Sequence, residues 1–596
     1  MKIRSVLIAN RGEIAVRIIR ACRELGVRAI AVHSEADAGS LWTRLADEAV
    51  NIGPAPARES YLGIDRLIAA AKTTGADAVH PGYGLLSESP EFAEAVVAAG
   101  LRFIGPAPRV IATMGDKVEA RKAAVAAGLP VLPGSDGTVE GFDDAIVHAR
   151  RIGWPIAVKA SFGGGGRGMR VAHGEDDLKA ALEQASREAS AAFGRGEIYL
   201  ERYLVRPRHV EVQVLGDGHG ALIHLGDRDC SVQRRHQKLI EEAPAPALSD
   251  GLRARILAAA VTLSKSVGYE SAGTVEFLAD VANDAFYFLE MNTRLQVEHG
   301  VTELVTGVDI VAAQIRIASG EPLGIAQTDV VTNGCAIQAR ISAEDPWEGF
   351  RPTPGRIDDL RLPGGPWLRL DFGVESGDGV PNFYDSMFGK VQAWGRTRDE
   401  ARMRLANALD ALVVAGPCTT APYLRGLLQQ PDFAAATHDT GSVERDWLPD
   451  AADRPAPTVT ARLQAAAPEM TVSERIISAP WGGQLVDVAV YGVRASREAG
   501  STTSAQLERR SASAGAGGPA ILAPMDAAVA HTPVAVGQPV AKGAPVLVLE
   551  AMKMEVVLAA PHDGIVEALH VGVGDAVKSG AVLAIVRANA NPGDET

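Results

Sequence analysis

Residues 286–298 read Phe-Tyr-Phe-Leu-Glu-Met-Asn-Thr-Arg-Leu-Gln-Val-Glu, an apolar run that continues into alternating polar and apolar side chains. An earlier run, Thr274-Val275-Glu276-Phe277-Leu278, is also typical of a strand, and Asn283-Asp284 between the two runs favours a turn. The sequence therefore predicts a β-hairpin in which Glu276 and Glu290 lie opposite each other on one face.

Two carboxylates that face each other across a hairpin repel, unless a divalent cation lies between them. Mg²⁺ binds a few carboxylates and fills its remaining positions with water and substrate phosphates. Glu276 and Glu290 are therefore candidate metal ligands. The alternative is that both lie on a solvated face, since charged side chains are mostly exposed.

Beyond the predicted hairpin, polar side chains occupy every second position, and an extended chain directs such positions to one side. They are Glu290, Asn292, Arg294, Gln296 and Glu298. We interpret the row as a site for a metal, an anion and proton transfer. The planar guanidinium of Arg294 suits a small oxyanion such as bicarbonate, and Glu298 is placed to act as a base.

A run of glycines lies between two strand-like segments at 156–160 and 169–172. The run consists of Gly163, Gly164, Gly165 and Gly166. Their backbone N–H groups can approach phosphate oxygens closely. A dinucleotide fingerprint would open a helix here, and the GK[ST] of a P-loop is missing. The pattern predicts a mobile cover over nucleotide phosphates, with a simple hairpin turn as the alternative.

The C-terminal part contains a repeat. Ala523-Pro524-Met525-Asp526 recurs 37 residues later as Ala560-Pro561-His562-Asp563. Both halves alternate short β-branched runs with glycine turns, so together they predict a small two-fold β-sandwich. Glu550-Ala551-Met552-Lys553-Met554-Glu555 lies between the halves and places Lys553 at the tip of a hairpin. A lone lysine at a turn is usually a solvated charge, but the flanking methionines favour a surface recognised by another protein.

The tetrapeptide Ala551-Met552-Lys553-Met554 resembles the signature of biotin carboxyl carrier domains. The resemblance implies that a biotin protein ligase attaches biotin covalently to Lys553. Lipoyl domains share the fold, but they typically have Asp before the lysine.

Residues 1–445 resemble the biotin carboxylase family in four motifs: Met114-Gly115-Asp116-Lys117, Arg208-His209-Val210-Glu211, Gln233-Arg234-Arg235-His236-Gln237-Lys238 and the segment Glu290 to His299. By this resemblance, ATP would contact Lys117, Lys159, Gly163, Gly164, Gly165, Gly166, Glu201, Leu204, His209, Gln233 and His236. Mg²⁺ or Mn²⁺ would be held by Glu276, Glu290 and Asn292. Bicarbonate would be held by Lys238, Arg294, Gln296 and Val297.

The resemblance also implies catalytic roles for Glu298, Arg340, Lys238 and Arg294. Glu298 would deprotonate bicarbonate, and Arg340 would stabilise biotin in its reactive form, with Tyr83 nearby. Members of the family usually have proline after Glu-His, whereas this chain has Gly300. We expect the glycine to loosen the loop that carries the base.

The expected architecture is a multidomain α/β chain. It comprises an open α/β N-terminal domain (1–112), an ATP-grasp domain with a glycine-rich lid (113–332), a mixed-sheet C-terminal carboxylase domain (333–445), a short partner-docking or linker region (446–498), a flexible tether (499–520) and a small all-β biotinyl, lipoyl-like sandwich (521–590). The 596 residues suit about four globular units at about 150 residues each.

Composition narrows the classes of partner and compartment. A net charge of −14 gives no basic excess for nucleic acid or an anionic membrane. The four cysteines are scattered without a CxxC pair, which favours a reducing cytoplasm over a disulfide framework. We see neither an export signal nor an apolar stretch of about 20 residues that would span a membrane.

The implied function is ATP-dependent carboxylation of biotin on the chain's own carrier domain, with bicarbonate as carbon source. The carboxyl group would pass to a separate carboxyltransferase (β) subunit of an acetyl- or propionyl-CoA carboxylase, and the carboxylase part would form a homo-oligomer. The alternatives are a subunit of a pyruvate or other 2-oxo-acid carboxylase, or of a methylcrotonyl-CoA carboxylase. A protein of another class, a scaffold with degenerate front domains, would use only the biotin hairpin.

Overall fold

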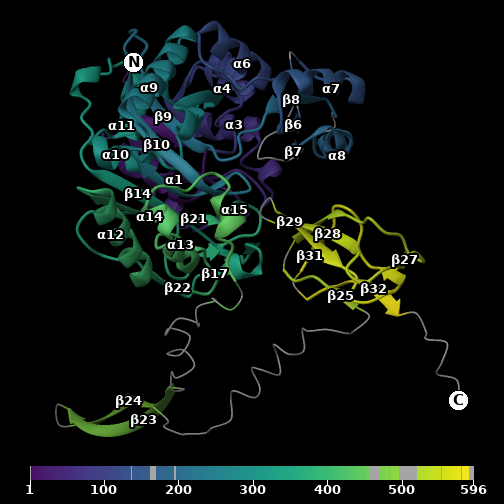
Figure 1. Cartoon of the computed structure of the whole chain (residues 1–596). Helices are drawn as coiled ribbons and strands as arrows, with labels where there is room; N and C mark the ends of the chain where they lie inside the picture. The colour runs from purple at the N-terminus through teal and green to yellow at the C-terminus, as the bar shows by residue number, and fades with distance from the viewer. Residues whose placement is uncertain are drawn as a thin grey trace, which may run out of the picture. The chain divides into compact units, whose positions relative to one another are not determined.

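The computed structural model describes residues 2–135, 137–160, 169–193, 196–450, 452, 454, 470–481, 484–495, 520–525, 527–551, 554–578 and 580–588. The chain forms two units, Met1–Asp453 and Arg454–Thr596 (Figure 1). Among the described helices, none combines the length and the apolar character needed to cross a membrane.

The N-terminal part is an open parallel sheet with strand order β3-β2-β1-β4-β5. The strands are β1 (Ser5–Ile8), β2 (Arg28–His33), β3 (Glu48–Asn51), β4 (Ala78–His80) and β5 (Arg102–Phe103). The helices are α1 (Gly12–Glu24), α2 (Leu41–Leu45), α3 (Ile64–Thr74), α4 (Pro90–Ala98) and α5 (Pro108–Gly115). Val6 and Ile8 enter one hydrophobic core and Leu7 the other, so both faces of the sheet are buried. This confirms the predicted open α/β fold.

A small antiparallel sheet of order β7-β6-β8 carries the strands on either side of the glycine run. The strands are β6 (Ile156–Ala160), β7 (Met169–Ala172) and β8 (Ile198–Arg202). The helices α7 (Gly141–Ile152) and α8 (Glu175–Phe193) lie beside it and share its core (Figure 1). β6 and β7 pair as antiparallel strands, which confirms the two strands predicted on either side of the glycine run. The four glycines themselves lie outside the described residues.

The centre of the first unit is an eight-stranded sheet of order β13-β12-β9-β10-β11-β14-β21-β19. Its strands are β9 (Arg208–Gly216), β10 (Leu222–Arg234), β11 (Gln237–Ala243), β12 (Ser271–Asp280), β13 (Ala285–Asn292), β14 (Cys335–Ser342), β19 (Leu368–Phe372) and β21 (Met387–Gly395). Every pairing in it is antiparallel. The strand that contains Arg340 was expected in a mixed sheet of its own; instead, β14 continues this sheet beside β11. Short turns between successive strands favour the antiparallel arrangement.

Helices and short strands complete the first unit. The helices are α6 (Lys117–Ala126), α9 (Asp250–Ser266), α10 (His299–Thr306), α11 (Ile310–Ala318), α12 (Arg398–Ala411), α13 (Ala421–Leu427), α14 (Pro431–Ala434) and α15 (Ser442–Asp446). Two-stranded pairs are formed by β15 (Glu344–Asp345) with β16 (Arg351–Pro352), β17 (Gly355–Arg356) with β20 (Gly379–Val380), and β18 (Asp359–Arg361) with β22 (Val413–Ala415). α10 packs against β14 and β21, which fixes the helix that follows Glu298.

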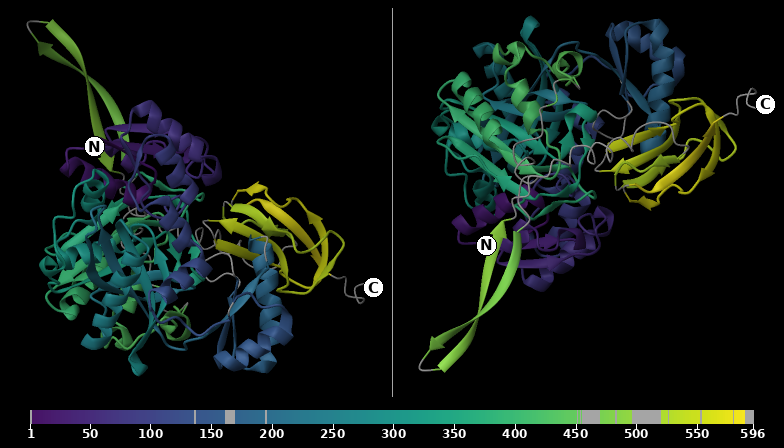
Figure 2. Two further views of the ribbon diagram at one scale, coloured as in Figure 1. Left: turned by 90° about the horizontal axis from the view of Figure 1, so that it is seen from above. Right: turned by 90° about the horizontal axis from the view of Figure 1, so that it is seen from below.

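The second unit contains a hairpin and a sandwich. β23 (Met470–Trp481) and β24 (Gln484–Ala495) pair along their whole length as a long twisted ribbon (Figure 2). The sandwich has two sheets of order β25-β32-β30-β27 and β29-β28-β26-β31. Its strands are β25 (Ala520–Leu522), β26 (Ala527–His531), β27 (Pro539–Val540), β28 (Pro545–Ala551), β29 (Met554–Ala559), β30 (Gly564–Leu569), β31 (Ala576–Val577) and β32 (Val582–Ala588).

The sandwich confirms the prediction from the sequence repeat. A shift of 37 residues carries β26 onto β30, β27 onto β31 and β28 onto β32, and so exchanges the two sheets. β28 and β29 pair with Ala551 opposite Met554. Lys553 and most of the expected tether at 499–520 lie outside the described residues.

Candidate active site

Three glutamates stand side by side across three neighbouring strands of the large sheet. Glu276 of β12 pairs with Glu290 of β13 on one side and with Glu211 of β9 on the other. The first pairing confirms the register predicted from the turn at 283–284. Glu211 and Glu276 are buried, and Glu290 is half-buried. Such a row of negative charge is stable only if cations neutralise it.

Lys238 of β11 supplies the central cation. Its Nζ lies 2.6 Å from Glu211 Oε2, 3.0 Å from Glu276 Oε1 and 2.7 Å from Glu298 Oε1. Burial lowers the pKa of Lys238, but the surrounding anionic groups raise it well above its ordinary value. The ammonium is thus permanently charged and joins the strands to the residue that precedes α10.

Glu276 and Glu290 occupy different electrostatic environments. Glu276 accepts hydrogen bonds from His209 Nε2 at 2.7 Å, Asn292 Nδ2 at 2.8 Å and Gln296 Nε2 at 3.0 Å, besides the one from Lys238. Burial raises its pKa, but Lys238 and His209 outweigh burial and bring the pKa far below its ordinary value.

Burial, followed by the negative charge of Glu276, raises the pKa of Glu290, and the charge of Lys117 only partly opposes them. Within the described part of the chain, the Glu290 carboxylate has no hydrogen-bond partner. One carboxylate of the facing pair is therefore neutralised and the other is not. This arrangement fits a divalent cation at Glu290, with phosphate oxygens completing its coordination.

Glu298 is fully buried immediately before α10. Its Oε1 accepts from Lys238 and its Oε2 accepts from Arg340 Nη2 at 2.9 Å. Burial raises the pKa of Glu298, but Lys238 and Arg340 lower it well below its ordinary value. The carboxylate is therefore ionised at neutral pH, as a proton acceptor has to be.

The chain from Glu290 to Glu298 is not extended throughout, contrary to the prediction that strand alternation directs its polar side chains to one side. β13 ends at Asn292, and Glu298 has φ −86° and ψ 9°, which are not strand angles. Leu295 is fully buried in the core shared with the N-terminal sheet, so the chain folds back between these residues. The folded loop, rather than strand alternation, brings Gln296 to Glu276 and Glu298 to Lys238.

Arg294 is more fully occupied than an open anion site. Its Nε donates to Glu88 Oε2 at 3.0 Å, Nη1 to Gln296 Oε1 at 2.8 Å and Nη2 to Asn292 Oδ1 at 2.7 Å. The amide oxygens that could serve a metal or an anion are thus held by this guanidinium. An anion at Arg294 would have to use the remaining N–H of Nη2 or replace one of these partners.

The residues expected at ATP form two groups. Lys159 Nζ lies 2.6 Å from Glu201 Oε2 in the small sheet, and Gln233 Nε2 lies 3.3 Å from His209 Nδ1 in the large one. Burial lowers the pKa of Lys117, and the charges of Glu290, Lys159 and Glu201 also act on it. His236 occupies a left-handed position (φ 64°) in the turn between β10 and β11. Leu204 follows β8.

Comparisons with known proteins bear on the whole arrangement. The family models that match are "Biotin carboxylase, N-terminal domain" at 2–111, "Carbamoyl-phosphate synthase L chain, ATP binding domain" at 116–326, "Biotin carboxylase C-terminal domain" at 338–445 and "Biotin-requiring enzyme" at 519–586. A biotin carboxylase of Pseudomonas aeruginosa is 53% identical over 429 residues, which are 72% of this chain and 95% of that protein. The chain belongs to the biotin carboxylase family.

Further relatives support the assignment to the biotin carboxylase family. The biotin-dependent acyl-coenzyme A carboxylase alpha3 subunit of Mycobacterium leprae is 42% identical over 604 residues, covering 98% of this chain and 99% of that one. The crystal structure of the Campylobacter jejuni biotin carboxylase–β,γ-ATP complex has a TM-score of 0.72 and 46% identity over 74% of this chain and 99% of its own. The protein is an ATP-dependent biotin carboxylase joined to a biotin carrier domain.

This biotin carboxylase also contains site residues that sequence reasoning missed. Arg340 is bound by Glu241 as well as by Glu298, and Arg294 by Glu88. Arg228 is fully buried and bonds to Glu211. Glu211 stands two positions from His209 in a quoted motif, so strand alternation could have identified it. The other three had no local signal.

A network beneath the loop involves Tyr83 and a buried ion pair. Lys390 Nζ lies 3.0 Å from Glu13 Oε1 and donates to the Val297 carbonyl at 2.8 Å. The Tyr83 hydroxyl donates to the same Glu13 oxygen. Burial and the negative charge of Glu13 raise the pKa of Tyr83 well above its ordinary value.

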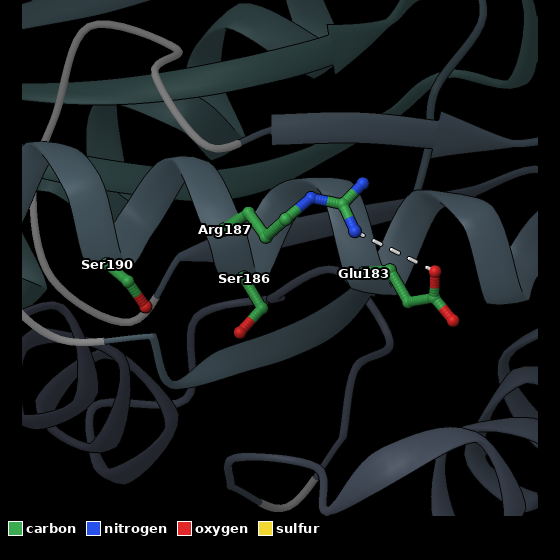
Figure 3. A pocket seen from close by; sticks show the side chains of 4 residues that line it. All are labelled: Glu183, Ser186, Arg187 and Ser190. Atoms are coloured by element: carbon green, nitrogen blue, oxygen red, sulfur yellow. Dashed lines mark ion pairs between the residues drawn. The ribbon is translucent and has the colours of Figure 1, made fainter.

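A shallow hollow on α8 is a separate feature of the biotin carboxylase. It is lined by Glu183, Ser186, Arg187 and Ser190 (Figure 3). Its one ion pair, Glu183 with Arg187 at 3.8 Å, is exposed and one helical turn apart. None of these residues belongs to the charged cluster around Lys238, so the hollow is not the active site.

Proposed function

We propose that this biotin carboxylase is the α subunit of a two-component acyl-CoA carboxylase and that its carboxyl-transfer partner is a separate β subunit. The observation that carries the proposal is the whole-length similarity to the M. leprae alpha3 subunit, which extends through the carrier domain. The P. aeruginosa biotin carboxylase, by contrast, covers 72% of the chain. The region 446–498 then serves in docking or linking, and 499–520 as the tether.

The charged cluster supports the proposed chemistry of the first half-reaction. Glu298 takes the proton of bicarbonate, whose oxygen then forms a bond to the γ-phosphorus of ATP as the bond to the β-phosphate breaks. ADP and carboxyphosphate result. Lys238 lies beside Glu298, and its ammonium group stabilises the negative charge of bicarbonate. Electrostatic stabilisation of this kind is usually the largest single contribution to catalysis.

The metal and the second substrate have matching residues. Glu276, Glu290 and Asn292 would hold Mg²⁺ or Mn²⁺, which neutralises phosphate charge during phosphoryl transfer. Lys117, Lys159, Glu201, Leu204, His209, Gln233 and His236 would contact ATP, with the glycines at 163–166 as lid. Arg294, Gln296 and Val297 would hold bicarbonate, and Arg340 with Tyr83 would orient biotin. Biotin on Lys553 supplies a carrier for the carboxyl group between two active sites.

A second candidate acceptor is pyruvate. One of the pyruvate carboxylase subunits of Methanothermobacter thermautotrophicus is 51% identical over 72% of this chain and 87% of its own length. That similarity covers only 72% of this chain. It therefore supports the carboxylation of biotin, which both kinds of enzyme share, and does not identify the acceptor. The alpha subunit of the mitochondrial methylcrotonoyl-CoA carboxylase of rice is 48% identical over 444 residues. These are 74% of this chain but only 60% of the rice subunit.

Identification of the partner tests the acceptor directly. The biotinylated full chain is used to isolate the protein that co-purifies with it, and the pair is assayed for ATP-dependent carboxylation. We expect activity with acetyl-CoA or propionyl-CoA. Activity with pyruvate or methylcrotonyl-CoA alone would replace the proposed acceptor and leave the biotin carboxylase assignment intact.

A further inference from the structure

The loop that carries Glu298 rests on one face of β21. Lys390 and Gln392 are two positions apart on that strand and therefore point to the same side. Lys390 holds the carbonyl of Val297, the residue before Glu298. Gln392 lies against Gly300, two residues after Glu298. The strand thus contacts the loop on both sides of the carboxylate.

Gly300 and Gln392 are closely complementary. A Cβ atom built on Gly300 would lie 1.9 Å from Gln392 Oε1 and 2.8 Å from its Cδ, well inside van der Waals contact. Gly300 is not among the residues with positive φ, so its backbone would suit any amino acid. The atoms nearest to a side chain at position 300 therefore all belong to Gln392.

The Gln392 amide cannot move aside without losing a buried interaction. The side chain is fully buried, and its Nε2 donates to Asp371 Oδ2 at 2.9 Å. Asp371 is itself bound by Arg369 at 2.9 Å. Because a carboxylate needs a donor, the amide nitrogen faces Asp371 and the oxygen faces Gly300. Rotation away from Gly300 would leave the buried amide nitrogen of Gln392 without its acceptor, which costs about 1–3 kcal/mol.

We infer that Gly300 and Gln392 form a steric pair that, together with Lys390, positions Glu298 for proton transfer. Gln392 fills the space above Gly300, so the glycine does not loosen the loop as expected from sequence. Gln392 is a positioning residue, because it touches the first turn of α10 rather than the reacting atoms. The inference rests on the proposed role of Glu298 as base.

The test is a double-mutant cycle in the full-length biotinylated protein, with kinetics measured on free biotin. Gly300→Ala should lower kcat/KM for bicarbonate by about 10- to 100-fold, since small misplacements of a catalytic group have effects of this size. The KM for ATP should not change. Adding Gln392→Ala should restore kcat/KM to within about threefold of the Gln392→Ala single variant, as coupled neighbours require.

Gly251→Ala is the matched control, because Gly251 is also the second residue of a helix, has an ordinary φ and has open space around its Cβ position. It should leave bicarbonate kinetics unchanged. If Gly300→Ala fails to fold, recovery of folded, active protein by the double variant supports the pair. The inference is overturned if Gly300→Ala matches wild type, or if Gln392→Ala restores nothing. An active Glu298→Gln variant would instead overturn the proposed base.

Discussion

Glu276 and Glu290 face each other across β12 and β13, yet of these two carboxylates only Glu276 is bound by Lys238 and His209. The unneutralised Glu290 carries a raised pKa because it is buried beside a second carboxylate. This asymmetry leaves one ligand of the pair available to a cation that arrives with a nucleotide.

Replacement of Glu290 should separate stability from metal binding. Glu290→Gln removes the repulsion and should raise the melting temperature of the ligand-free protein. It should also weaken MgADP binding by about 10- to 100-fold, the range known for damage to metal sites. Thermal unfolding with and without MgADP measures both effects, with the exposed Glu183→Gln as control. Unchanged MgADP affinity would rule out Glu290 as a ligand.

The acid limb of the pH–rate profile should report on Glu298. Arg340→Met removes a cation that lowers the Glu298 pKa, so that pKa rises and the acid limb of kcat/KM for bicarbonate moves to higher pH. Glu241→Gln removes an anion beside Arg340 and Glu298, so the limb should move to lower pH or stay. Profiles that shift in the reverse order would contradict these assignments.

Glu344 should make stability depend on pH near neutrality. Burial, partly offset by the hydrogen bond from Ser386, raises its pKa from 4.5 to about 7. The folded state therefore binds the proton more tightly than the unfolded state. The stabilisation is fully present below pH 4.5 and is lost as pH rises through 7, at most about 3 kcal/mol.

Glu344→Gln should abolish that component, so the melting temperatures of variant and wild type should diverge between pH 4.5 and 7, with the variant more stable at the upper end. Parallel curves would show that the carboxyl titrates normally.

The carrier lysine should be separable from the carboxylase. Lys553→Ala should give a protein that streptavidin does not detect, and it should still carboxylate free biotin at the normal rate. Lys542→Ala, which alters an exposed lysine of the same sandwich, should keep both properties. Streptavidin binding by the Lys553 variant would show that biotin is attached elsewhere.

The sequence was sufficient for features that depend on local pattern. The turn residues at 283–284 predicted that Glu276 and Glu290 would pair, and a register shift between Glu276 and Phe277 completes that pairing. The 37-residue repeat predicted a sandwich, and its sheets exchange under the same shift. The strands predicted on either side of the glycine run are present and pair with each other. In each of these cases, periodicity and turn residues indicate which strands lie next to each other.

The partners of the site residues could not be predicted, because they come from distant segments. Glu88 reaches Arg294 across 206 positions, and Lys390 reaches Val297 across 93. The alternation of polar and apolar residues after Glu290 does not explain why their side chains meet. β13 ends at Asn292, and the loop that follows folds back with Leu295 buried in the core. Tertiary packing thus determined the geometry of the base.

The most direct measurement is transfer of label from [¹⁴C]bicarbonate to the protein's own biotin, with ATP and Mg²⁺ and no second protein present. Wild type should become labelled. Glu298→Gln should bind ATP with unchanged affinity, and it should release no ADP in response to bicarbonate and acquire no label. Labelling of Glu298→Gln at the wild-type rate would contradict the role of this cluster in the carboxylation of biotin.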